Sequence, residues 1–176
     1  MYNFLNRFEI AFSRLCLIFA SCTAVTIASF AILIPLDLFI RSIGWGNMPW
    51  LHEGIEYTLY AGVFLGAPWV LQQGAHVRVD LFVAHLPKNL AVSAEILLDF
   101  VGCIICVFLF YYGLQGSIEA YVDKSIPDKL LKIANWWMVL IFAVSFCMLA
   151  IEFLLRMRRA RTVLEKEKAI STEAGF

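Results

Sequence analysis

The chain has 176 residues, of which 61% are hydrophobic and 16% are charged, with 14 basic residues against 14 acidic ones. This composition excludes an ordinary soluble domain and indicates a membrane protein, in which the placement of charges is more informative than their sum. A chain of this length can form one helical bundle, but it can hardly enclose a large transport pathway alone.

Four uncharged apolar segments occupy most of the chain. Each holds roughly twenty residues, enough for a helix to cross a hydrocarbon core of about 30 Å. We therefore predict an all-α integral membrane protein that forms a single membrane domain over residues 1–176. Its four transmembrane helices are expected at about residues 15–36, 55–75, 95–121 and 133–155, with a basic cytoplasmic tail at 156–176.

The first residues have an amphipathic pattern. Phe4, Phe8 and Phe12 recur at every fourth position, while Arg7 and Ser13 are turned away from them. This pattern is typical of a short helix that lies in the membrane interface, and equally of the first turns of the first transmembrane helix. The apolar segment that follows is too long for a signal peptide and ends in no clear cleavage site, so we expect no cleavage.

The second apolar segment contains two features that affect helix packing. Gly62 and Gly66 form a G-x-x-x-G pair, which lets a neighbouring helix approach closely. Pro68 cannot donate a hydrogen bond to the carbonyl of Phe64, so we expect the helix to bend there.

The third segment begins with two acids one helical turn apart, Glu95 and Asp99. Like charges at this spacing repel each other mildly, so we expect a basic partner. Arg78, at the end of the second segment, is the partner that we predict. At the start of the fourth segment, Trp136 and Trp137 mark the membrane interface.

The distribution of Lys and Arg predicts the orientation. With four spans, both termini lie on one side, and ten of the 14 basic residues fall on that side. Because cytoplasmic loops carry the excess of positive charge, we expect both termini in the cytoplasm.

Few residues could carry chemistry. Cys103 and Cys106 have the spacing of a redox motif, but they lie inside an apolar helix, where helix packing is the favoured role. The histidines His52, His76 and His85 all fall in loops, which argues against a haem between helices. No acid lies at mid-depth in a span, where ion-coupled carriers place theirs. We expect no cofactor, no metal ion and no nucleic acid.

Two polar stretches flank the second span. The outer one runs over 37–41 and 49–53, and the inner one over 74–81, closing with Leu86 and Pro87. From the physics alone, Arg41, Arg78 and Trp50 are interfacial anchors, and Glu53 is an acid near a helix N-terminus.

The order of these residues resembles a known family, the small membrane (Q) subunits of tripartite ATP-independent periplasmic (TRAP) transporters. Members have an arginine after the first span, a tryptophan with a glutamate three residues later, a Gly-Ala step, a His-Val-Arg-Val-Asp-like stretch and a Leu-Pro. Many members also have a Pro-x-Gly-like start to the fourth span, whereas this chain has Ile133 to Trp137 there. The candidate motif and structural residues are Arg41, Trp50, Glu53, Gly62, Gly66, His76, Arg78 and Asp80.

The resemblance implies a non-catalytic subunit of the bacterial inner membrane. Such subunits are thought to scaffold a large multi-span membrane subunit (M) that carries the substrate and sodium sites. A periplasmic substrate-binding protein delivers the substrate, usually an organic acid. We also expect phospholipids at the interface between the two membrane subunits.

Two other classes fit less well. A four-span thiol:quinone oxidoreductase-like enzyme needs cysteine pairs on the periplasmic side, and the loops at 37–56 and 119–132 contain no cysteine. A small dimeric drug exporter needs an acid within its first span, and residues 15–36 contain none.

Overall fold

The computed structural model describes residues 2–44, 46, 49–73, 88–124, 126–127 and 129–173. Side chains are described between residues 7 and 162, except at 88–92 and in the gaps between those ranges. The structure has four α-helices and no strand in this described part: α1 (Tyr2–Ser42), α2 (Pro49–Gln72), α4 (Lys88–Val122) and α5 (Asn135–Glu173). The prediction of an all-α fold is confirmed.

The helix α1 is continuous over 41 residues. No glycine or proline precedes Pro35 in it, so nothing interrupts the hydrogen-bond ladder between the amphipathic start and the apolar segment. The separate interfacial helix is therefore absent from this part of the chain, and the phenylalanines belong to the first turns of α1. The helix ends at Ser42, where Gly44 adopts a positive φ of 81° and its amide donates to the carbonyl of Arg41 (3.2 Å).

Three of the four helices contain segments that are long and apolar enough to cross a membrane. These segments are Arg7–Ser42, Ser93–Val122 and Asn135–Thr162. The helix α2 is shorter, and His52, Glu53 and Glu56 place three ionisable side chains in its first two turns.

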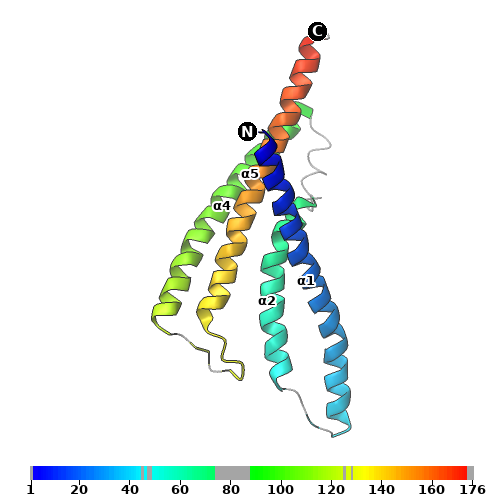
Figure 1. Ribbon diagram of the computed structural model, residues 1–176, viewed down its shortest axis with the longest axis vertical. Coiled ribbons are helices and arrows are strands. Elements are labelled where there is room, and N and C mark those ends of the chain that lie inside the picture. Colours follow the sequence, from blue (N-terminus) through cyan, green and yellow to red (C-terminus); the bar gives the residue numbers. More distant parts are fainter. Residues whose placement is uncertain are drawn as a thin grey trace.

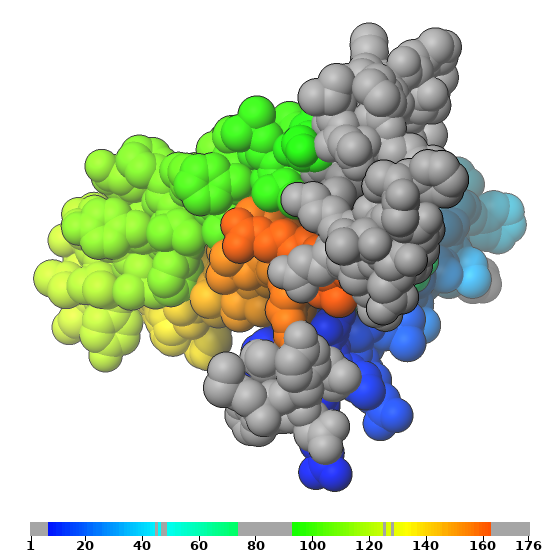
Figure 2. All heavy atoms as spheres, turned by 90° about the horizontal axis from the view of Figure 1, so that it is seen from above, coloured from blue at the N-terminus to red at the C-terminus, as the bar shows by residue number. Residues whose placement is uncertain are grey.

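The helices form two antiparallel hairpins, α1 with α2 and α4 with α5 (Figure 1). The hairpins meet where α2 contacts α5, and α5 lies between α4 and α1 when the bundle is viewed from above (Figure 2). We call the end at which α1 begins the inner end, and the end with the connections 43–48 and 123–134 the outer end. The helices α1 and α4 are farthest apart at the outer end (Figure 1).

The apolar core is small and joins the first helix to the last. Phe12 and Cys16 of α1 are buried with Met148 and Leu155 of α5, and Phe19, Trp69 and Ile151 pack around them. Most other large apolar side chains point outward, as expected for a protein whose solvent is lipid.

Glycines allow α4 and α5 to approach closely. A Cβ atom at Gly102 would lie 2.7 Å from the ring of Phe153, and one at Gly113 would lie 2.9 Å from the ring of Phe142. Neither of these two glycines was expected at a helix contact from the sequence, because they lack the four-residue spacing of Gly62 and Gly66.

Candidate functional site: polar contacts between the two hairpins

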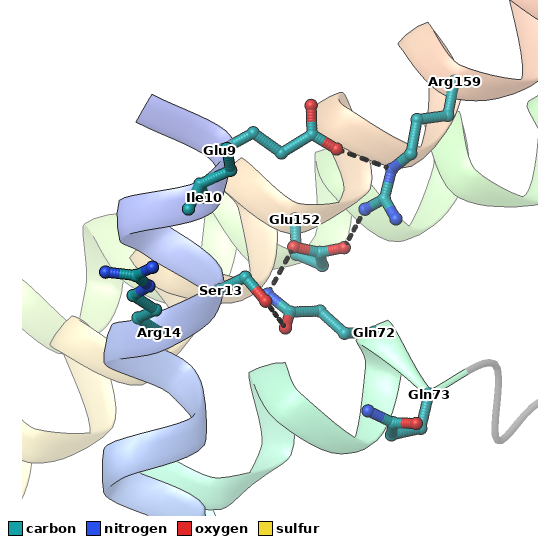
Figure 3. Close-up of a pocket in the computed structure, with 8 residues that line it drawn as sticks. All are labelled: Glu9, Ile10, Ser13, Arg14, Gln72, Gln73, Glu152 and Arg159. Atoms are coloured by element: carbon teal, nitrogen blue, oxygen red, sulfur yellow. Dashed lines mark hydrogen bonds and ion pairs between the residues drawn. The ribbon is translucent and has the colours of Figure 1, made fainter. Parts of the chain in front are cut away.

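A buried carboxylate organises the inner end. Glu152 of α5 is fully buried, and its Oε2 accepts a hydrogen bond from Nε2 of Gln72 (2.9 Å). Ser13 of α1 donates to Oε1 of the same amide (3.3 Å). Arg159 forms an ion pair with Glu152 and a second one with Glu9 (Nε to Oε1, 3.2 Å). Figure 3 shows these five residues, which we call the Glu152 network, converging from α1, α2 and α5.

The Glu152 network surrounds the buried carboxylate with a cation and a hydrogen-bond donor. A carboxylate removed from water is costly unless a cation and hydrogen-bond donors surround it, and Arg159 and Gln72 provide both. The side chain of Arg159 remains 48% exposed, so it links the buried acid to Glu9 at the surface. The network also lines a cavity of about 520 Å³. It therefore fixes three helices relative to one another at one end.

Glu152 was not predicted from the sequence. The residue follows directly after the uncharged segment that ends at Ile151, so it resembles an ordinary interfacial acid. A signal was nevertheless present, because Gln72 lies near the end of the second apolar segment, on the same side of the membrane. Two polar side chains at the same depth on neighbouring helices can form a hydrogen bond across the interface.

A second buried acid at the inner end has a basic partner, as the sequence suggested. Asp99 of α4 is 5% exposed, and its Oδ2 lies 3.4 Å from Nε of Arg156 on α5. Arg156 also approaches the carbonyl of Leu71 on α2 (3.5 Å). The predicted partner, Arg78, lies outside the described residues together with His76 and Asp80, so the pairing of Arg78 stays a prediction.

Polar contacts continue along α2 and α5 through the middle of the bundle. The hydroxyl of Tyr60 donates to the carbonyl of Met138 (3.2 Å), and the fully buried hydroxyl of Ser145 donates to the carbonyl of Phe64. Pro68 leaves that carbonyl without its usual donor in α2. The two hairpins are thus aligned by hydrogen bonds in a region where apolar burial gives little drive for association.

Glu53 connects α2 to the loop between α4 and α5 at the outer end. Its Oε1 accepts from the amide of Leu130 (3.0 Å) and its Oε2 from the amide of Leu131 (2.6 Å). These two hydrogen bonds hold the pKa of the Glu53 carboxyl below its usual range, and the bond from Leu131 has the larger effect. Lys129 forms an ion pair with Glu56 (2.7 Å), and its pKa is raised by that bond. We call these five residues the Glu53 clamp.

The other candidate residues at the outer end lie apart from the Glu53 clamp. Arg41 is exposed in the last turn of α1, and Trp50 is 54% exposed in the first turn of α2. Both positions suit the interfacial anchors that the sequence suggested. Of the motif residues at this end, Glu53 is the one that joins two hairpins.

Gly62 and Gly66 are buried on the face of α2 that meets α1. A Cβ at Gly62 would lie 2.7 Å from Cγ2 of Thr23. The hydroxyl of Thr23 is 2.8 Å from the carbonyl of Phe19 and 3.3 Å from that of Gly62. The glycine therefore lets the backbone of α2 approach a threonine whose side chain is already fixed.

The cysteines differ in burial: Cys16 and Cys106 are buried, whereas Cys22 is exposed. All five are free thiols, and Sγ of Cys103 lies 3.8 Å from the carbonyl of Ala150 on α5. Cys16 belongs to the core between α1 and α5. Within the described residues, no group of His, Cys, Asp and Glu side chains could hold a metal ion.

Most of the chain matches a known protein family. A family model described as "Tripartite ATP-independent periplasmic transporters, DctQ component" matches residues 30–162. The match includes Glu53, Glu152 and Arg159, whereas Glu9 and Ser13 precede it. No curated protein matches the chain.

Proposed function

Because the chain belongs to the DctQ family, the small membrane components of TRAP transporters, we propose that it acts as a non-catalytic scaffold for the large membrane subunit of such a transporter. The apolar helices and the family together make it a protein of the bacterial inner membrane. The transport chemistry, with the substrate and sodium sites, belongs in this proposal to the large subunit, and a periplasmic binding protein delivers an organic acid.

One observation carries the scaffold proposal: α1 presents long apolar faces that no described part of the chain covers. None of the residues in its most apolar stretch is buried. Ile18, Val25 and Ile32, spaced seven residues apart on one face, are 57%, 66% and 71% exposed. Such a surface suits contact with a second membrane protein and with the phospholipids that we expect at the subunit interface.

The polar contacts along α2 and α5 support the same proposal. A scaffold must hold its own helices rigidly while its partner moves, and hydrogen bonds fix the register of helices in lipid more specifically than apolar contacts do. Such hydrogen bonds fix the helices at three levels of this chain. They belong to the Glu152 network at the inner end, the Ser145–Phe64 bond in the middle and the Glu53 clamp at the outer end.

We further propose that α2 is a fourth span and that both termini are cytoplasmic. The helix lies antiparallel to α1 and contacts α5 along its length, from Tyr60 to Gln72, which supports a crossing. A reporter fused after Phe176 should then be cytoplasmic, and one placed within 44–48 periplasmic. The opposite result would overturn the orientation.

Reconstitution tests the function. Liposomes with the large subunit, this chain and the binding protein should take up the organic acid in a sodium gradient, whereas liposomes with this chain alone should take up nothing. Full uptake without this chain would contradict the scaffold role, and uptake by the chain alone would contradict its dependence on a partner.

The oxidoreductase alternative is not favoured. The cysteine pair of α4 packs against α5 inside the bundle. The loops at the outer end contain no cysteine for exchange with a periplasmic thiol.

A further inference from the structure

One face of α1 near the inner end combines two arginines with apolar side chains. Arg7, Ala11, Arg14 and Ile18 follow one another at intervals of three or four residues and so share this face. Together with Ile10 and Leu15 they line a shallow cavity of about 420 Å³. The arginines lie at its inner part, and Leu15 and Ile18 begin the uncharged segment that enters the membrane.

Neither arginine is neutralised within the described part of the chain. Glu9 and Glu152, the two acids that line a cavity together with Arg14, are engaged by Arg159. Arg14 also borders the cavity of the Glu152 network, but in Figure 3 its guanidinium points away from Glu152 and Arg159. At this end of α1, the two arginines therefore leave an excess of positive charge at the boundary between headgroups and acyl chains.

We propose that this face binds an anionic phospholipid, with the phosphate on Arg14 and Arg7 and an acyl chain along Leu15 and Ile18. Arginine suits this role because its guanidinium can form two parallel hydrogen bonds to a phosphate. The apolar half of the cavity favours a lipid over a free phosphate, which has no group to place there. The inference depends on the membrane location, but not on the transport role.

Binding of lipid to the purified chain tests the proposal directly. Native mass spectrometry in mild detergent would measure the lipid-bound fraction with phosphatidylglycerol, with phosphatidylcholine of the same acyl chains, and with glycerol phosphate as the soluble headgroup. We expect phosphatidylglycerol to bind most tightly. Arg7→Gln and Arg14→Gln should each weaken it about fivefold.

The matched control is Arg161→Gln, which removes the same charge from an exposed position on α5. It should bind phosphatidylglycerol like the wild type, and melting curves of all three variants verify that the bundle is intact. If all three variants lost phosphatidylglycerol binding equally, the lipid would be attracted by the overall charge of the chain, and the proposed site would be overturned. Equal binding of both lipids, or binding of glycerol phosphate as tight as that of phosphatidylglycerol, would overturn it as well. None of these measurements involves uptake, so they are independent of the transport proposal.

Discussion

The hydroxyl of Ser145 on α5 donates a hydrogen bond to the carbonyl of Phe64 on α2, the carbonyl that Pro68 deprives of its donor. In lipid no water can satisfy such a carbonyl, so a neighbouring helix must do so. The proline thereby becomes a specific attachment point for α5. The rings of Phe142 and Phe146 surround the ring of Phe64, with centroids 5.3 Å and 6.2 Å away, and keep the site apolar.

A double-mutant cycle measures this contact. Ser145→Ala should lower the free energy of unfolding by about 1 kcal/mol, in the range found for hydrogen bonds between helices in membranes. Pro68→Ala restores an amide that can donate to the carbonyl of Phe64 within α2. In the Pro68→Ala background, Ser145→Ala should therefore lower the free energy of unfolding by less than it does in the wild type. Thermal melting of the purified chain gives all four values, and strictly additive effects would contradict the coupling.

Gly62→Ala should separate α1 from α2. The added Cβ would meet Cγ2 of Thr23 at 2.7 Å, and overpacking of this kind costs about 1–3 kcal/mol. Thr23 cannot turn away freely, because its hydroxyl is bonded to Phe19 and its side chain is branched at Cβ.

Two variants control this prediction. Thr23→Ser keeps the hydroxyl and removes the clashing methyl group, so it should rescue Gly62→Ala. Gly54→Ala adds the same atom where nothing lies within 4 Å, and it should leave the melting temperature unchanged or raise it. A failure of Thr23→Ser to rescue would show that the contact with Thr23 is not the cause.

The Glu53 clamp should make stability depend on pH. Folding lowers the pKa of Glu53, so the unfolded chain binds this proton more tightly. The contribution of the clamp is then complete above the unfolded pKa of about 4.3 and is lost as the pH falls through the lower folded value.

Melting temperatures between about pH 6 and pH 3 would measure this dependence. The wild type should lose more stability on acidification than Glu53→Gln, which has no proton to take up. Glu119→Gln, at an exposed position of α4, should keep the wild-type profile. Superimposable profiles for the wild type and Glu53→Gln would exclude a contribution of this carboxylate.

Glu152→Ala should destabilise the bundle strongly. It leaves Gln72 without its acceptor and removes one of the two carboxylates that Arg159 binds. The loss of one partner of a buried ion pair costs about 3–5 kcal/mol, and the partial exposure of Arg159 places the expected effect at the lower limit. Glu119→Ala is the control, and equal melting temperatures for the two variants would contradict the structural importance of the network.

The sequence contained enough information to predict the helices and one of their contact points. Uninterrupted apolar runs predicted the three long helices, and the Gly62–Gly66 spacing indicated where α2 could meet a neighbouring helix. At Pro68 the sequence predicted a bend, and not the contact with Ser145. The pairing of α2 with α5 could not be derived, because helices with apolar side chains on every face have no amphipathic stripe to orient them. Glu152 and Gln72 are 80 residues apart, and their contact depends on a register that the three-dimensional packing sets.

The contact between Glu9 and Arg159 joins the beginning of the chain to a position near its end. During synthesis α1 leaves the ribosome first, yet the partners of Glu9, Phe12 and Cys16 on α5 are made last. Until then, Glu9 and Gln72 cannot form their contacts with Arg159 and Glu152. The finished bundle therefore depends on completion of translation, and a chain that stops before Glu152 would leave its first helix without its contacts to α5 at the inner end.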